Sequence, residues 1–490
     1  MLNDSLTPND VKTPLSYFEN YFPDSFFEKT ATYTAMYSMS KFGKQLDTSS
    51  TEIKKLFGVH LIMGSIPYPR LRMYFSRGYG LHAVKSVLSR DRVFRLRNCL
   101  HLVDVNSPPA NNNNFLWKIQ PIVDTVRQGC LKIARTADNY SIDEQMIPFC
   151  GRCEVKQYVP NKPRPVGLKN FVITTSAGLM IDFEVYQGSR TPLARRDLGL
   201  GPAVVLRLAE SVPKNSHIFF DRYFTTVRLI QELREDQKFG TGTIMSNRLN
   251  LKWKKDSKMK RGEHQQFLAK NGRKRVYAVK WKDNKSVTLV SSKFGALPTV
   301  EVKRWDKKEK QRKEIPCPSI VWNYNQKMGG VDILDQMLEY YRTFIRTRKW
   351  TLKCILHFLD LGVTNSWMEY RNDCLRAKLP KNKISDLLEF RLAVAEALCA
   401  SPAKARHDAS ESDSSSEDEQ PQKRSNWRQP LPRVDKRTDG YDHWPVIDEL
   451  TTARMCRSKN CKSRTRARCT KCNVYLCLTS KKNCFREFHM

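Results

Sequence analysis

The sequence predicts a mixed α/β core, with helical segments before and after it along the chain and a small cysteine-rich domain at the end. Three observations lead to this prediction. Apolar residues recur with a helical period from about residue 14 to residue 140. The pattern then changes to short strands that alternate with helices, as in α/β folds. Six of the 14 cysteines fall within the last 35 residues.

The helical part is predicted to contain three amphipathic segments. The stretch 50–64 places its apolar residues on one face, and Ser50 or Thr51 is positioned to cap its start. Two further helices are expected at 84–102 and 116–136. At 490 residues the chain is too long for one hydrophobic core, so several domains are expected.

Strands are predicted in the middle of the chain. The stretch 139–149 predicts one strand, and 169–188 predicts two strands that fold back at Ser176-Ala177-Gly178 as a hairpin. A short buried strand, HIFF, is expected at 217–220, with a helix before it and another after it. This order predicts an α/β domain.

Basic residues are in large excess, with 85 Lys and Arg against 50 Asp and Glu and a formal net charge of +35. The excess is concentrated between residues 246 and 315, where tryptophans and tyrosines lie among the cations. A solvated basic surface is the simpler interpretation, but cations mixed with aromatic faces also suit a nucleic-acid strand. Arg273, Lys274 and Arg275 are candidate contacts to DNA there.

Helical periodicity returns after residue 320 and continues to about residue 400, before a serine-rich, acidic stretch that predicts a flexible linker. The longest uncharged stretches are too short to span a bilayer, so no membrane association is expected. The expected domains are a tail at 1–13, a first helical part at 14–140, an α/β domain at 141–340 with a basic insertion at about 246–315, a second helical part at 341–400, a linker at 401–440 and a cysteine-rich domain at 441–490.

Three aspartates lie in unusual positions for a charged residue. Asp143 lies within an apolar strand, Asp221 follows the strand HIFF, and Asp332 begins a helical segment. Buried carboxylates are costly unless they are paired or hold a metal, and Mg²⁺ prefers carboxylate oxygens. Two such ions can support phosphodiester cleavage. Asp335, three residues after Asp332, is a candidate fourth acid on the same helix face.

Each aspartate has an ordinary alternative role. Asp143 or Asp221 alone is more often a strand-end or cap residue, and Asp335 can equally be an ion-pair partner of a nearby cation. The combination is more specific, because strand, later strand and following helix is the order in which ribonuclease-H-like nucleotidyl transferases present their acids. That comparison is an analogy of fold.

The C-terminal pattern predicts two zinc sites. Six cysteines and two histidines supply eight ligands, the number needed for two closed tetrahedral sites. Disulfides are the alternative, disfavoured by the reducing compartment that the scattered remaining cysteines indicate. A lone histidine at His443 can instead pack on Trp444, and the module can instead bind protein. The candidate ligands are His443, Cys456, Cys461, Cys469, Cys472, Cys477, Cys484 and His489.

Four separated segments resemble, in order, the signature blocks of piggyBac transposases. The resemblance covers nearly the whole chain. The segments are SIDEQMIPFCGRCEVKQYVPNKPRPVGLK, FFDRYFTT, NQKMGGVDILDQM and RKWTLKCILHFLD.

The resemblance implies a ribonuclease-H-like catalytic core, a split all-α dimerisation and DNA-binding domain, and a cysteine-rich domain that recognises transposon-end repeats. It gives Asp143, Asp221 and Asp332 catalytic, Mg²⁺-binding roles and makes Asp335 the additional acid. It also implies that Trp350 stacks on a base, which places the neighbouring Arg348 and Lys349 at DNA; a core position is the alternative for Trp350.

The implied reaction is cut-and-paste transposition of double-stranded DNA, by strand cleavage, hairpin formation and joining at a TTAA target. The reaction would use Mg²⁺ as its catalytic cofactor, with about two ions bound, and the cysteine-rich domain would hold two structural Zn²⁺ ions. A homodimer and nuclear residence are expected, and the basic run 304–313 would suit import.

Two departures from the family pattern leave an alternative function open. Arg222 follows the second acid where the family usually has asparagine, which favours a domesticated, catalytically silent DNA-binding protein. The zinc ligands begin with Cys-x4-Cys where relatives often have Cys-x2-Cys, so the sequence leaves open which ligands share an ion.

Cys150 and Cys153 form a CxxC with no second ligand pair nearby and are interpreted as incidental. A non-specific nuclease is disfavoured, because it would not need the zinc tail.

Overall fold

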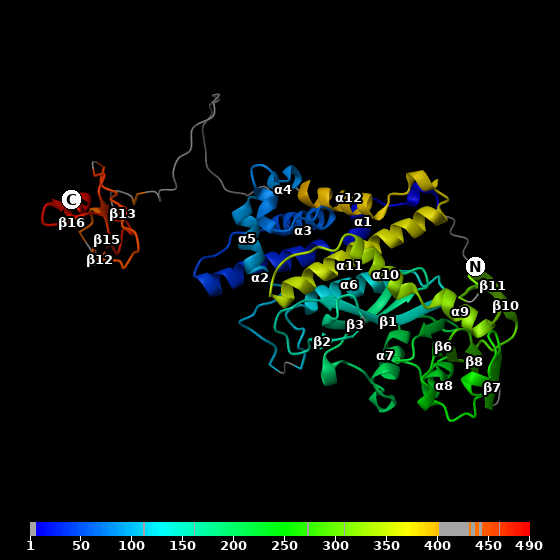
Figure 1. The fold of residues 1–490 in the computed structure, drawn as a ribbon. Helices are drawn as coiled ribbons and strands as arrows, with labels where there is room; N and C mark the ends of the chain where they lie inside the picture. The colour runs from blue at the N-terminus through cyan, green and yellow to red at the C-terminus, as the bar shows by residue number, and fades with distance from the viewer. Residues whose placement is uncertain are drawn as a thin grey trace. The chain divides into compact units, whose positions relative to one another are not determined.

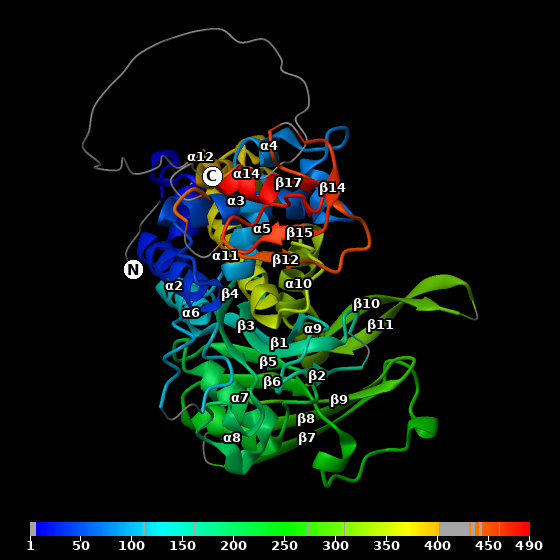
Figure 2. The same cartoon turned by 90° about the vertical axis from the view of Figure 1, so that its left-hand side faces the viewer.

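The chain divides into two compact units, Met1–Arg406 and His407–Met490. The structure is a computed structural model, and Figures 1 and 2 follow the chain through both units. It describes residues 6–110, 113–160, 162–271, 274–307, 309–400, 431–432, 437–440, 443–459 and 461–490.

A nine-stranded mixed sheet organises the first unit. Its strands run in the spatial order β2-β3-β1-β5-β6-β9-β8-β7, with β4 paired to β3. β5 lies parallel to both β1 and β6, while the remaining neighbours are antiparallel. The strands are β1 (Asn139–Pro148), β2 (Gln157–Tyr158), β3 (Val166–Thr175), β4 (Met180–Val185), β5 (His217–Phe220), β6 (Phe239–Thr243), β7 (His264–Asn271), β8 (Lys274–Lys282) and β9 (Ser286–Ser291).

The strands predicted before residue 221 are confirmed. The strand expected at 139–149 is β1, and the expected hairpin is formed by β3 and β4. Gly178 in its turn has φ +97, and a Cβ there would lie 2.8 Å from Ile333, so both the backbone and the neighbouring helix require glycine. The basic stretch 246–315 contributes β7, β8 and β9, which continue the same sheet.

Helices from both ends of the first unit pack together beside this sheet. In Figure 1, α11 runs between the α3 and α12 pair and the strands β1 and β3. The helices before the sheet are α1 (Pro14–Glu19), α2 (Asp24–Phe42), α3 (Ser50–Ser65), α4 (His82–Lys85), α5 (Arg90–Cys99) and α6 (Gln120–Lys132). Those within or after it are α7 (Leu200–Ala209), α8 (Val227–Glu235), α9 (Ser319–Lys327), α10 (Gly330–Tyr340), α11 (Trp350–Arg376) and α12 (Leu387–Ala400).

The single helix expected at 84–102 is wrong. The segment forms two helices: α4 ends at Lys85, and α5 begins at Arg90 after a short break. Ser89 begins α5 by accepting a hydrogen bond from the backbone N–H of Arg92, and serine at this position favours a new helix start over a continuous helix. Ser49, rather than Ser50 or Thr51, caps α3 in the same way.

α11 is buried around most of its circumference, so its polar side chains need partners inside the protein. Asn365 accepts a hydrogen bond from the backbone N–H of Met180 at 2.7 Å and donates one to the carbonyl of the same residue at 3.0 Å. It thereby pairs with the backbone of β4 as a neighbouring strand would. This contact joins the central helix to the sheet.

A buried ion pair joins α11 to α12. Arg391 is 2% exposed and Asp360 is 3% exposed, and the guanidinium donates to the carboxylate at 2.8 Å. Thr343 donates to Asp360 from both its backbone N–H and its hydroxyl, at 2.9 and 2.8 Å. Arg391 also donates to the carbonyl of Leu61 in α3 at 3.2 Å. The Arg391 guanidinium therefore joins the Asp360 carboxylate of α11 to the backbone of α3, and so links the second helical part to the first.

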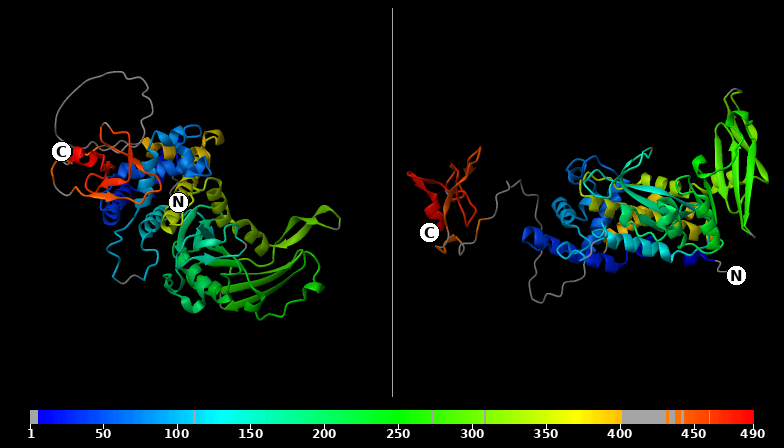
Figure 3. Two further views of the ribbon diagram at one scale, coloured as in Figure 1. Left: turned by 60° about the vertical axis from the view of Figure 1, so that its left-hand side comes forward. Right: turned by 90° about the horizontal axis from the view of Figure 1, so that it is seen from below.

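A two-stranded ribbon, β10 (Thr299–Asp306) and β11 (Gln311–Pro318), lies outside the main sheet. In Figures 2 and 3 it extends outward from the first unit. Its base is fixed by a small apolar cluster that includes Trp281, Ile315 and Ile320. No helix among the described residues has the length and apolar character needed to cross a membrane.

Replacement of Arg391 by methionine should lower the free energy of unfolding of the first unit by about 3–5 kcal/mol, because Asp360 would keep a buried charge without its partner. Urea titration followed by circular dichroism measures this. Arg90→Met, which removes an exposed ion pair with Asp91, is the control and should leave the midpoint unchanged. Equal midpoints for the two variants would contradict the role of the buried pair.

Candidate active site and metal-binding clusters

Parallel pairing of β1 with β5 brings the first two acids to the same part of the sheet. Ile142 is paired with Phe220, and Asp143 and Asp221 are the next residues of the two segments. The Asp221 carboxylate accepts a hydrogen bond from the backbone N–H of Tyr223 at 2.8 Å, and the Asp143 carboxylate accepts one from that of Glu144 at 2.7 Å. Both side chains are half-buried.

A close backbone approach brings the start of α10 against β1 and β3. A Cβ on Gly330 would lie 2.3 Å from the carbonyl oxygen of Thr175 and 2.5 Å from the hydroxyls of Ser141 and Thr174, so only glycine fits. Ser141 lies two residues before Asp143, on the same face of β1. Asp332, in the first turn of α10, is therefore held near the sheet acids.

The acids affect one another's titration. The pKa of Asp143 is raised to about 7, mainly by burial; the charge of Lys162 opposes this shift, and the charges of Asp221 and Asp332 contribute to it. Burial also raises the pKa of Asp335 to about 6, against a hydrogen bond from Gln145, and raises the pKa of Asp221. Sequence reasoning did not identify Gln145 or Lys162.

The chemistry of this donor set fits a hard divalent cation. Carboxylate oxygens are the ligands that Mg²⁺ prefers, and a cation would offset the burial, and the smaller repulsion, that raise the pKa of Asp143. The carboxylates are spaced more loosely than the tail ligands described below. Among the described residues, only two cysteine and histidine sets bring three or more such ligand atoms within 4.8 Å of one another.

A directional chain of hydrogen bonds leads from Asp335 into α11. Gln145 donates from Nε2 to the Asp335 carboxylate at 2.7 Å, and its Oε1 lies 3.2 Å from Nε2 of buried His357. Nδ1 of His357 lies 3.2 Å from Nη1 of Arg342, which can only donate. His357 therefore accepts at Nδ1 and donates from Nε2 as a neutral ring. Burial, followed by the charge of Arg342, keeps its pKa well below the usual range.

Tyr324 of α9 is a further neighbour of the acids that the sequence did not reveal. Burial raises the pKa of its phenol, and the negative charges of Asp221, Asp143 and Asp332 raise it further. The phenol therefore stays protonated beside the acids and is able to donate a hydrogen bond.

Arg222 does not pair with the second acid. Its side chain is exposed, and no ion pair in the described part of the chain joins it to Asp221. Arg248 holds the turn instead, donating from Nη1 to the carbonyl oxygens of Arg222, Tyr223 and Thr225 at 3.0, 3.1 and 2.8 Å. Arg248 was not among the residues predicted from the sequence.

Trp350 is half-buried at the start of α11 and lines an open cavity of about 820 Å³. The cations around this cavity include Lys118, Arg152 and Lys156. Lys349 is exposed and donates to the carbonyl of Asn98 at 2.8 Å.

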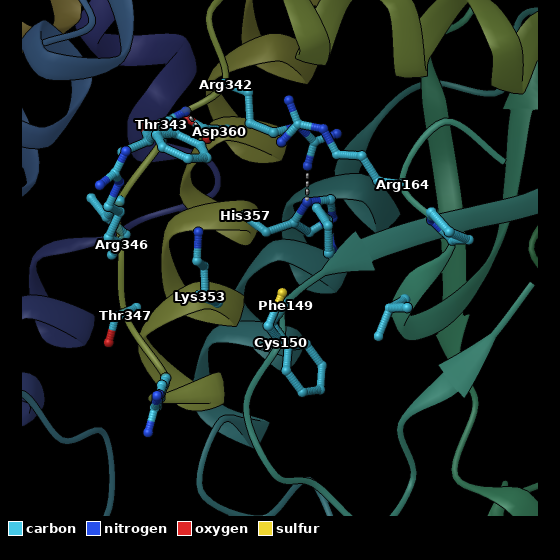
Figure 4. Close-up of a pocket in the computed structure, with 16 residues that line it drawn as sticks. Phe149, Cys150, Arg164, Arg342, Thr343, Arg346, Thr347, Lys353, His357 and Asp360 are labelled. Carbon is cyan, nitrogen blue, oxygen red and sulfur yellow. Dashed lines mark hydrogen bonds between the residues drawn. The ribbon is translucent and has the colours of Figure 1, made fainter. Parts of the chain in front are cut away.

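A second cavity of about 810 Å³, the Arg342 cavity, lies beside the segment that leads into α11. Figure 4 shows Arg164, Arg346 and Lys353 around it, with the contact between Arg342 and His357 dashed. The exposed Arg348 also lines it.

Of the predicted contacts at 273–275, only the side chain of Arg275 is described, and it is not brought to the acids. Arg273 lies outside the described residues, and the side chain of Lys274 is likewise not described. Arg275 is exposed on β8, which β6 and β9 separate from β5. Cys150 and Cys153 belong to neither metal-ligand set found among the described residues.

The tail of the second unit gathers the eight predicted zinc ligands into two sets of four. In each set the ligand atoms lie within 4.8 Å of one another. Nδ1 of His443 lies 3.4 Å from Sγ of Cys469 and 3.5 Å from Sγ of Cys472, so this histidine faces the thiols rather than only its neighbour Trp444. The sets are His443, Cys469, Cys472 and His489, and Cys456, Cys461, Cys477 and Cys484.

The two sets are interleaved along the chain. Each set takes ligands from both the beginning and the end of the tail. The spacing of the ligands in sequence did not reveal this pairing. Short two-stranded pairings, such as β12 (Pro445–Ile447) with β15 (Ala467–Cys469), connect the segments that carry the ligands.

The chain is similar to known transposases and transposase-derived proteins. The sequence model of the family described as Transposase IS4 matches residues 13–367. The human PiggyBac transposable element-derived protein 3 is 29% identical over 494 residues, covering 98% of this chain and 78% of that protein. Human PiggyBac transposable element-derived protein 2 is 30% identical over 393 residues, or 78% of this chain and 64% of that protein.

A solved structure shares the fold. The cryo-EM structure of a piggyBac transposase synaptic complex with hairpin DNA superimposes with a TM-score of 0.68 at 24% sequence identity, covering 81% of this chain and 82% of that one. The matched family defines a class of proteins, the transposases. Within that class, the chain belongs to the piggyBac family.

Replacement of Asp143 by asparagine should stabilise the metal-free protein at pH 8. The folded-state pKa of about 7 lies above the ordinary value of 3.8 for this group, so folding binds a proton and stability rises as the pH falls between these values. The gain from asparagine should be about 2–4 kcal/mol at pH 8 and should disappear near pH 4. Thermal unfolding in EDTA measures it.

Added Mg²⁺ provides the control for this prediction. Because a divalent ion would bind the ionised carboxylate, Mg²⁺ at pH 8 should stabilise the wild type more than the asparagine variant. A variant that is less stable than the wild type in EDTA at pH 8 would contradict a costly buried charge at Asp143.

Proposed function

We propose that this protein is a DNA transposase that binds transposon-end repeats, cleaves DNA with divalent metal ions, forms hairpin ends and joins them at TTAA targets. The observation that supports it best is the convergence of Asp143, Asp221 and Asp332 from two parallel strands and a helix that Gly330 holds against the sheet. Asp335, one turn along the same helix, is the proposed fourth acid.

The proposed roles of the side chains follow from their charges. Asp143, Asp221 and Asp332 would hold Mg²⁺, which when bound supplies charge stabilisation for an in-line displacement at phosphorus. Gln145 orients the Asp335 carboxylate by donating to it at 2.7 Å. Lys162, which lowers the pKa of Asp143 by its charge, favours the ionised carboxylate that a metal needs. Tyr324 remains a neutral donor beside them.

The remaining parts of the proposal concern DNA and assembly. We assign the sheet and its helices to a ribonuclease-H-like core, and the helices on both sides of it in sequence to a split dimerisation and DNA-binding domain. Trp350, Arg348 and Lys349 are proposed DNA contacts, supported by their positions at three cavities lined by cations. The solved relative is described as a synaptic complex with hairpin DNA, which supports a homodimer on DNA and a nuclear location.

A catalytically silent DNA-binding protein is the second candidate. Arg222 supports it, because an exposed cation directly follows the second acid. Two human relatives are named as transposable element-derived proteins, which also fits a descendant that no longer moves DNA. The carboxylates support the first candidate, and the two differ in one measurable property, strand cleavage.

Strand cleavage of a duplex that carries matched terminal repeats should require both Mg²⁺ and the acids. Asp332→Ala should lower the cleavage rate by at least about a thousandfold while leaving DNA affinity within about threefold, because the aspartate would act on the metal rather than on binding. A gel-based nicking assay and a binding titration measure the two quantities. Specific DNA binding without cleavage by the wild type would select the silent protein.

We also propose that each ligand set in the tail binds one Zn²⁺, giving two ions per chain. Four cysteine and histidine ligands per set match a closed structural site, and so small an apolar cluster would depend on metal for stability.

Cys477→Ser should reduce the zinc content from about two ions per chain to about one or fewer, since a closed site loses a ligand. Because the sets are interleaved, the thiols of Cys469 and Cys472 should also become reactive. Elemental analysis and thiol labelling measure this, with Cys150→Ser, an exposed cysteine of the first unit, as the matched control. Two ions per chain in Cys477→Ser would contradict the assignment.

A further inference from the structure

A third cavity in the helical part, the Arg97 cavity, is lined by cations without any acid. It measures about 430 Å³ and lies between α5, the segment after α3 and the segment that leads into α11. No Asp or Glu is among its lining residues. The cations are Arg70, Arg72, Arg97, Arg346 and Lys349.

Arg97 is the only one of the five cations of this cavity that is not exposed. Its neighbours Val93 and Leu96 are fully buried in the core, so α5 carries the guanidinium partly below the surface. Its Nε is buried and has no hydrogen-bond partner among the described residues. Burial lowers the pKa of Arg97 to about 10, and no carboxylate opposes that shift.

Three nearby side chains do not supply the negative charge that Arg97 lacks. Glu52, an acid of α3 close to α5, is bound by Arg92, whose Nε and Nη2 donate to it at 2.5 and 2.6 Å. His60 stays neutral, because burial and the charge of Arg97 lower its pKa to about 3. Lys349 adds a further positive charge, and partial burial of its ammonium group, followed by the charges of Lys41 and Arg97, lowers its pKa.

A half-buried cation without a partner destabilises the folded protein unless a ligand supplies the opposite charge. Guanidinium groups form paired, charge-assisted hydrogen bonds with phosphate oxygens. The Arg97 cavity shares Phe344, Ile345, Arg346 and Thr347 with the Arg342 cavity, so one chain segment separates two basic hollows. Phosphates in a row would fit this arrangement better than an isolated anion.

We propose that the Arg97 cavity binds a backbone phosphate of DNA, with Arg97 as the residue that receives it. The inference rests on the proposed function, since it names where the helical part contacts DNA. The group that the cavity would recognise is a phosphate, which DNA and inorganic phosphate both supply, and inorganic phosphate is therefore the alternative ligand. According to this proposal, Arg97 lowers the stability of the free protein and raises its affinity for DNA.

Arg97→Met separates this proposal from a structural role for Arg97. Removing an unpaired buried cation should raise the thermal midpoint of the free, full-length protein, by about 2 °C or more. Inorganic phosphate should stabilise the wild type and have a much smaller effect on the variant. Duplex DNA should bind the variant about tenfold more weakly, with a slope of log K against log salt reduced by about one.

Arg92→Met is the matched control, because it lies on the same helix and is already paired with Glu52. This variant should be less stable than the wild type and keep the full phosphate response. Arg72→Met, on the rim of the cavity, is a second test of the site and should show a similar weakening of DNA binding.

Three results would overturn the site. The first is a lower thermal midpoint for Arg97→Met than for the wild type without ligand. The second is a variant that inorganic phosphate stabilises as much as it stabilises the wild type. The third is unchanged DNA affinity in a variant that phosphate no longer stabilises, which would make inorganic phosphate the ligand. A wild type that binds no DNA at all would instead overturn the proposed function, and this result differs from all three. Weaker DNA binding together with a more stable free variant supports the proposal.

Discussion

The burial of α11 constrains the rest of the first unit. A helix enclosed on most sides cannot leave polar groups unpaired, and three of its buried polar side chains bind different parts of the structure. Asn365 pairs with the backbone of β4, Asp360 pairs with Arg391 of α12, and His357 contacts Gln145 of β1. The sheet, the two helical parts and the acids are therefore positioned against one common element. A shift of α11 would disturb all of them together.

This arrangement joins the acids to the basic surface of the same unit. Gln145 contacts Asp335 on one side and His357 on the other, and His357 faces Arg342 at the edge of a cavity. The neutral state of His357 fixes the direction of these hydrogen bonds, because a charged ring could not accept from Arg342. Residues that would contact DNA and residues that would hold metal are thus connected by three side chains, without the intervention of a flexible loop.

Local sequence patterns predicted the strands around the first two acids, because alternation and turn residues are short-range signals. They did not predict the break at Ser89, where a capping side chain competes with continuous helical periodicity. The types of the eight tail ligands were readable from the sequence, but their grouping depends on how the tail folds back. Arg97 could not have been found, since a cation on an amphipathic helix normally faces solvent and only the tertiary structure shows that its Nε is buried without a partner. The assigned roles of the acids stay predictions.

The interleaved ligand sets make the tail a single cooperative unit. Each set closes a loop that contains ligands of the other, so neither half of the tail holds a complete site, and division of the tail at any point between Cys456 and Cys484 would destroy both. The lengths between ligands are less restricted, because a longer connection changes the entropy of loop closure only slowly. The first cysteine pair, for example, has four intervening residues and both of its thiols belong to one set. In such a module the order of the ligands along the chain is fixed, while insertions between them are tolerated, and new DNA or protein contacts can arise there without loss of the fold.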